Sequence, residues 1–63
     1  MTTLANIEKL AQYVAARAID TATAAHCARE MGHRARFEML PNGRCYWYLY
    51  GAGLQGSQSA RGA

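Results

Sequence analysis

The segment that decides the fold runs from His33 to Tyr50 and reads HRARFEMLPNGRCYWYLY. Two stretches with β-strand character flank Pro41, Asn42 and Gly43. Proline suits the first central position of a type I turn, asparagine suits the second, and glycine suits the left-handed conformation that follows in a bulged hairpin loop. A two-residue loop of Asn42 and Gly43 alone is the alternative. The segment predicts a β-hairpin, and the strand register chooses between the two loops.

The three-residue loop separates the side chains of the hairpin into two sets. It pairs Phe37 with Trp47 and Met39 with Cys45. One side is then wholly apolar and carries Ala35, Phe37, Met39, Cys45, Trp47 and Leu49. The other side carries Arg34, Arg36, Glu38, Leu40, Arg44, Tyr46, Tyr48 and Tyr50. A slip of one residue would mix the two sets, which a sheet with one buried face disfavours, so we predict the bulged loop.

Two stretches before the hairpin repeat apolar residues at helical spacing. The first covers residues 4–18, where one arc about 120° wide contains Leu4, Ile7, Leu10, Ala11, Val14 and Ala18. The second covers residues 21–31, where one side contains Ala24, Cys27, Ala28 and Met31. Asp20 is a good N-cap for the second helix, and Gly32 can take the left-handed conformation that ends it. The pattern predicts two helices separated near Asp20.

The apolar side of a lone hairpin needs a partner, because an isolated hairpin is marginal in water. The two helical stripes supply that surface, so we predict an α+β fold of ααββ order. In it, two N-terminal helices pack on one face of a C-terminal two-stranded antiparallel hairpin. This fold makes residues 1–50 a single compact domain. Residues 51–63 hold four glycines, two serines and one large hydrophobe, which predicts a flexible Gly/Ser-rich tail.

The small size of the chain argues against an enzyme. Of its 63 residues, only nine are Leu, Ile, Val or Phe, and a chain this short buries roughly 60% of its unfolded surface. Such a thin core leaves little material for an enclosed active site, and the carboxylates fall on different predicted surfaces. Residue types that bind zinc are present at His26, Cys27, His33 and Cys45. Their spacing contains no C-x-x-C or H-x-x-x-H pair. We therefore predict no catalytic residues, no metal site and no cofactor.

Charge and hydropathy indicate where the chain acts. Seven Lys and Arg residues against four Asp and Glu residues give a formal net charge of +3, and six of the seven cations are Arg. No apolar run approaches the roughly 18 residues that span a bilayer, and the sequence does not open like a secretory signal. Two cysteines do not make a disulfide framework. We expect a cytoplasmic protein with reduced thiols and no membrane partner.

The polar side of the hairpin is the candidate binding surface. It interleaves three arginines with three tyrosines: Arg34, Arg36, Arg44, Tyr46, Tyr48 and Tyr50. Tyr and Arg are enriched where proteins bind proteins, and aromatic rings beside cations also stack on unpaired bases. We predict docking onto a larger protein or nucleoprotein complex, with direct DNA or RNA binding by the same residues as the alternative. A second core face covered in a dimer and an idle solvated face are the other interpretations.

Two further expectations concern partners and origin. Both strands of a two-stranded sheet have a free edge, which favours a homodimer or docking onto a partner's sheet unless the tail or a helix covers an edge. The short chain, rich in Ala, Arg and Gly, is typical of accessory proteins of phages or mobile elements. Such proteins act by occupying a functional surface of a host protein, which includes inhibition of host defence complexes.

Overall fold

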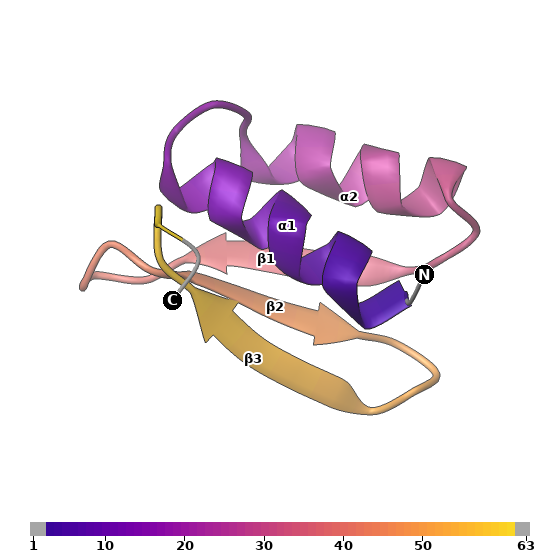
Figure 1. The fold of residues 1–63 in the computed structure, drawn as a ribbon. Coiled ribbons are helices and arrows are strands. Elements are labelled where there is room, and N and C mark those ends of the chain that lie inside the picture. The colour runs from indigo at the N-terminus through magenta and orange to yellow at the C-terminus, as the bar shows by residue number, and fades with distance from the viewer. Residues whose placement is uncertain (1–2, 62–63) are drawn as a thin grey trace.

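The computed structural model describes residues 3–61 of the chain. Its elements follow in the order α1 (Thr3–Ala15), α2 (Thr21–Glu30), β1 (Ala35–Met39), β2 (Cys45–Leu49) and β3 (Leu54–Gln58). The strands form one antiparallel sheet of order β1-β2-β3, and both helices lie on the same face of it (Figure 1). The predicted α+β class is therefore confirmed, whereas the predicted two-stranded ααββ order is wrong, because the sheet has a third strand.

The third strand comes from the segment that the sequence predicted to be a flexible tail. Residues 54–58 pair antiparallel with β2, with Gly56 opposite Trp47. Two glycines in the connecting turn, Gly51 and Gly53, have φ angles of 88° and 69°, which favour glycine. The strand forms because it pairs the second edge of β2, whose backbone groups would otherwise have no partner in the sheet. The last two residues of the predicted tail, 62 and 63, lie outside the described residues.

The loop and register of the β1–β2 hairpin match the prediction. Phe37 pairs with Trp47 and Met39 pairs with Cys45. The amide of Gly43 donates to the carbonyl oxygen of Leu40 at 3.0 Å, and the amide of Leu40 donates to the carbonyl oxygen of Arg44 at 2.8 Å. With a φ of 86° at Gly43, this is a type I turn followed by a bulge. The three-residue loop is confirmed over the two-residue alternative.

Both ends of α2 follow the predicted capping chemistry. The Asp20 carboxylate accepts a hydrogen bond from the Thr23 amide at 2.7 Å, and the side chain of Thr23 together with this amide lowers the pKa of Asp20. At the other end, Gly32 has a φ of 87° and its amide donates to the carbonyl oxygen of Arg29 at 2.8 Å. The next amide, of His33, donates to the carbonyl oxygen of Ala28 at 2.9 Å. These two bonds form a Schellman motif, which satisfies carbonyls at the helix end.

The first helix is shorter than predicted and ends in the same motif without a glycine. It stops at Ala15, so the predicted core residue Ala18 is exposed beyond its end. Arg17 has a φ of 63°, and its amide donates to the carbonyl oxygen of Val14 at 2.9 Å. The Ala18 amide donates to the carbonyl oxygen of Tyr13 at 2.9 Å. Arg17 therefore holds the left-handed position that Gly32 holds in α2.

Replacing Arg17 with glycine is expected to stabilise the protein. The left-handed conformation costs a residue with a β-carbon about 1 kcal/mol, whereas glycine adopts it freely. Glycine also raises the conformational entropy of the unfolded chain, which offsets part of this gain. We therefore expect the free energy of unfolding, measured by urea titration, to rise by about 0.5 kcal/mol. Arg17→Ala, which removes the same charge and keeps the β-carbon, should give no such gain. Equal effects of the two variants would show that the backbone conformation is not the cause.

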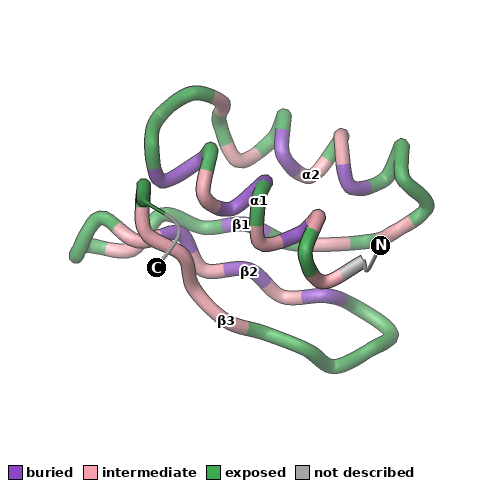
Figure 2. Tube along the Cα trace, viewed as in Figure 1, coloured by how far each residue is buried: buried purple, intermediate pink, exposed green. Residues whose placement is uncertain are grey.

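The core lies between the helices and the sheet (Figure 2). Its buried residues are Ile7, Leu10, Ala11, Val14, Ala15, Ala24, Ala28, Phe37, Cys45, Trp47 and Leu49. Of the predicted inward set, Met39 is instead 38% exposed, because it ends the edge strand β1. Met31, predicted on the inner side of the second helix, is 41% exposed because it follows the last helical residue. Many of the buried helical residues are alanines, so the large side chains of β2 make up much of the buried apolar volume.

Candidate interaction surface

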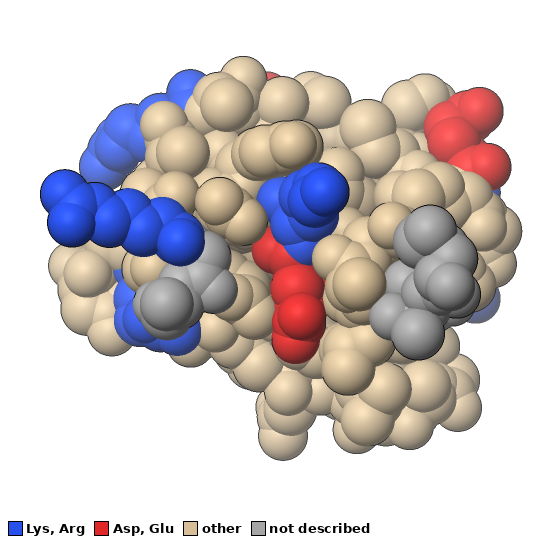
Figure 3. All heavy atoms as spheres, viewed as in Figure 1, with Lys and Arg blue, Asp and Glu red and all other residues tan. Residues whose placement is uncertain are grey.

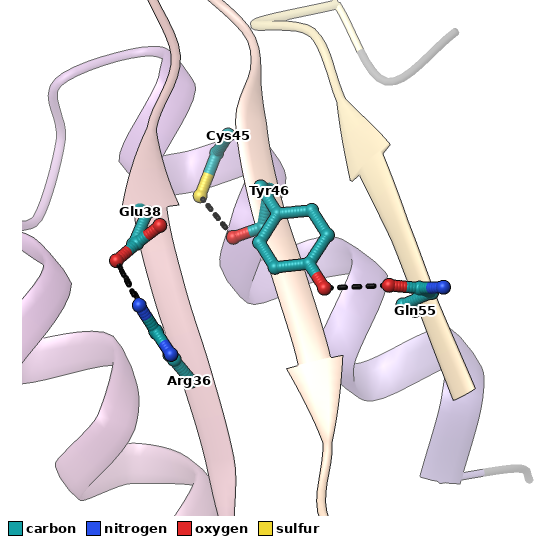
Figure 4. Close-up of polar contacts among 5 residues, drawn as sticks. All are labelled: Arg36, Glu38, Cys45, Tyr46 and Gln55. Atoms are coloured by element: carbon teal, nitrogen blue, oxygen red, sulfur yellow. Dashed lines mark hydrogen bonds and ion pairs between the residues drawn. The ribbon is translucent and has the colours of Figure 1, made fainter. Parts of the chain in front are cut away.

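The face of the sheet opposite the helices is not covered by any segment within residues 3–61 (Figure 1). Alternation along the strands places the even-numbered side chains of β1 and β2 on this face, and Figure 4 shows three of them, Arg36, Glu38 and Tyr46, on the side away from the helices. We call this surface the tyrosine face. Its members are Arg34, Arg36, Glu38, Arg44, Tyr46, Tyr48, Tyr50, Gln55 and Ser57.

The tyrosines form a row along the middle of this face. Tyr46 and Tyr48 lie on the central strand β2 and are half-buried, and Tyr50 follows directly and is 47% exposed. The Tyr46 hydroxyl donates to the Gln55 side-chain oxygen at 2.6 Å (Figure 4). The rings of Tyr48 and Tyr50 meet edge to face, with centroids 5.1 Å apart and an interplanar angle of 77°. These contacts restrict the rings before any partner binds, which reduces the entropy lost on binding.

The arginines of the face are partly engaged within the chain. The Arg36 Nε donates to Glu38 Oε2 at 3.2 Å (Figure 4). This hydrogen bond raises the pKa of Arg36. Arg44 reaches across to β3, where its Nε donates to the Ser57 hydroxyl at 2.9 Å and its Nη2 donates to the Ser57 carbonyl oxygen at 2.8 Å. Arg44 thus ties the third strand to the hairpin, whereas Arg34 lies exposed at the margin of the face.

Three residues of the face were absent from the predicted binding set. Glu38 was predicted to lie on this side, but its pairing with Arg36 was not foreseen. Gln55 and Ser57 were missed because they belong to the segment predicted to be flexible. The signal that marked them was weak. Gly51 and Gly53 could form a turn, and after them the polar residues alternate with Leu54 and Gly56.

The residue types considered for zinc do not gather into one site. Cys27 is a half-buried free thiol and Cys45 is a buried one, and burial raises the pKa of Cys45. The His26 Nε2 lies 3.6 Å from Glu30 Oε2 on the exposed side of α2. Within residues 3–61, no group of three His, Cys, Asp or Glu residues is placed to hold a metal ion. Over the same range, no helix has the length and apolar character to cross a membrane.

Comparison with protein-family models, with curated proteins and with solved structures finds no match for the chain. No relative therefore supplies a function by similarity. The physical character of the surface is the basis for a functional inference: an uncovered sheet face with a central row of tyrosines, flanked by arginines that are held in place.

Proposed function

We propose that the chain is a non-enzymatic binding module that docks its tyrosine face onto a larger protein. The observation that carries this proposal is the row of Tyr46, Tyr48 and Tyr50 on a sheet face without intramolecular cover in the described part of the chain. Tyrosine supplies a large amphipathic contact area and loses little conformational freedom on binding. The aromatic rings would form the centre of the interface, and Arg34 and Arg36 its polar rim.

The charge of the face favours a protein partner over nucleic acid. Three arginines and one glutamate leave a formal charge of only +2 on it. Two of these arginines already bond within the chain, Arg36 to Glu38 and Arg44 to Ser57. The other four cations, Lys9, Arg17, Arg29 and Arg61, are not part of the face. Figure 3 shows several of the Lys and Arg side chains at the end of the molecule where α1 ends. A phosphate group that bound Arg36 or Arg44 would have to displace their bonds to Glu38 and Ser57. DNA or RNA binding is therefore the alternative, and the experiment must exclude it.

The mode of action that fits such a module is occupation of a partner's surface. A domain of 63 residues can block a functional site on a larger protein without chemistry of its own. The narrower expectation of a cytoplasmic phage or mobile-element protein that inhibits a host defence complex stays a prediction. The expected homodimer also stays a prediction. It would have to use the edge of β3 in at least one copy, because β2 is paired on both sides and α2 packs over β1.

Replacing Tyr48 with alanine is expected to reduce partner binding about 30-fold while leaving the fold intact. The loss corresponds to about 2 kcal/mol, as for a central aromatic residue of an interface. The measurement is affinity capture from host-cell lysate, with and without nuclease, followed by titration of the captured protein against the variant. Tyr13→Ala is the matched control, because Tyr13 is 43% exposed on α1, away from the tyrosine face.

Three outcomes would contradict the proposal. Capture that nuclease abolishes would indicate the nucleic-acid alternative, as would a steep fall of affinity with salt. Equal binding by the Tyr48→Ala and Tyr13→Ala variants would show that the tyrosine face is not the interface. Unfolding of Tyr48→Ala would place this ring in a second core, as in a dimer that buries the face.

A further inference from the structure

The outer edge of β1 carries backbone groups that pair with no other strand among residues 3–61. Hydrogen bonds from the Tyr50 amide to the Arg34 carbonyl oxygen and from the Leu40 amide to the Arg44 carbonyl oxygen flank the β1–β2 ladder. Because bonded and non-bonded residues alternate in an antiparallel pair, the even-numbered residues of β1 bond to β2. The odd-numbered residues then point their N–H and C=O groups away from the sheet. These outward groups belong to Ala35, Phe37 and Met39.

Helix α2 stands above this edge and forms a groove with it. The helix packs on α1 and β1 and does not reach β2 within the described chain. Thr21, Ala25 and Arg29 lie on one flank of α2, one in each turn, and each lines a hollow shared with β1. The first two of these side chains are small, so they would obstruct a strand added beside β1 less than long side chains would.

The two ends of the groove differ in chemistry. The hollow at the end of β1 has an apolar part formed by Val14, Ala18, Ile19, Phe37 and Met39, and its other lining residues are Arg17, Asp20, Thr21 and Glu38. The hollow at its start is lined by Arg29 and Arg34 and by no acidic residue. Neither guanidinium has a hydrogen-bond or ion-pair partner among residues 3–61. About four residues of extended chain, roughly 13 Å, separate the two ends. The groove therefore complements an extended chain with an apolar side chain at one end and a carboxylate at the other.

We propose that this groove binds an extended peptide segment of a partner protein, which adds to the sheet as a strand beside β1. Its backbone pairs with the outward groups of the odd-numbered β1 residues, an apolar side chain enters the hollow at Ile19 and Met39, and a carboxylate lies against Arg29. This is the geometry of recognition by strand addition. Two copies of this chain cannot pair β1 against β1, because the α2 helix of one copy would occupy the same space as the α2 helix of the other. The site meets the tyrosine face only at its margin, through Arg34 and Tyr50, and does not depend on the function proposed above.

Amide NMR of the labelled protein tests the proposal with defined probes. The probes are three N-acetylated hexapeptides of alternating threonine and valine: one with a free C-terminal carboxylate, one with a C-terminal amide, and one with a C-terminal amide and glutamate as its last residue. We expect saturable shifts and slowed hydrogen exchange at the amides of Ala35, Phe37 and Met39. The amides of Arg36 and Glu38 should change little, because they already bond to β2. The peptide without a carboxylate should bind at least fivefold more weakly. Comparison of the other two shows whether the groove prefers a C-terminal carboxylate or a glutamate side chain.

Charge variants test the basic end of the groove. Arg29→Glu should weaken binding of the carboxylate peptides at least fivefold and leave binding of the neutral peptide unchanged. Lys9→Glu is the control, since it makes the same charge change at an exposed position of α1, and it should bind as the unmodified protein does. The proposal is overturned if no probe gives saturable shifts at millimolar concentration, if the shifts centre on Tyr46 and Tyr48, or if Arg29→Glu binds like Lys9→Glu. None of these results bears on the Tyr48 experiment, which tests the proposed function separately.

Discussion

Replacing Trp47 with alanine is expected to unfold the protein at room temperature. Trp47 lies in the middle of the central strand and is only 3% exposed. Truncation of a buried tryptophan costs about 3–5 kcal/mol. Stability for this length is about 3–9 kcal/mol, and a core so small places the domain near the lower end. The helices cannot refill the cavity, because alanines make up much of their buried surface. The result would appear as loss of the far-ultraviolet circular dichroism of the folded state and of a cooperative thermal transition.

Two variants show whether this effect is specific to the buried indole. Trp47→Phe keeps an aromatic ring in the core and removes the indole Nε1, which is buried and has no hydrogen-bond partner in the described structure. It should remain folded, at a cost of about 1–2 kcal/mol. Tyr13→Ala removes a ring that is 43% exposed and should cost less than about 1 kcal/mol. A cooperatively folded Trp47→Ala protein, with the stability of Tyr13→Ala, would contradict the position of Trp47 in the core.

The hairpin and the ends of the second helix could be predicted from sequence because local chemistry determines them. Asn42 and Gly43 require a turn, and only one register gathers the apolar side chains of both strands on one side. Asp20 and Gly32 begin and end a helix by bonds to residues a few positions away. The exposure of Met39 could not be predicted in the same way, because it depends on which strand lies at the edge of the sheet.

The third strand could not be predicted, because nothing local in residues 54–58 favours it. Its glycine and polar residues have low strand propensity. The contacts that hold it come from residues distant in sequence: the open edge of β2 and the Arg44 guanidinium bound to Ser57. For the same reason, alternation alone could predict that the arginines and tyrosines share a face, but not which partners hold them. That Gln55 receives the Tyr46 hydrogen bond follows only from the position of β3.

Replacing Gly56 with valine is expected to destabilise the protein by about 1–2 kcal/mol, although strand propensity predicts the opposite sign. Valine is normally favoured over glycine in a strand by about 1 kcal/mol. In this fold, a β-carbon at Gly56 would lie 2.8 Å from Cζ2 and 3.1 Å from Cε2 of Trp47. The indole is rigid and buried, so the strand or the core must shift, and such overpacking costs about 1–3 kcal/mol. Gln58→Val, in the same strand and on the same face, should leave the free energy of unfolding within about 0.5 kcal/mol of the unmodified protein.

A double-mutant cycle separates this contact from a general intolerance of substitution in β3. Phenylalanine at position 47 lacks the indole nitrogen and the far part of the fused ring, the region that a β-carbon at Gly56 would meet. Gly56→Val should therefore cost less in the Trp47→Phe background than alone, with a coupling of at least about 1 kcal/mol in urea unfolding. Additive costs would mean that the two residues do not meet. In that case β3 would not pair with β2 in this register, since the position of the third strand rests on Gly56 leaving space for Trp47.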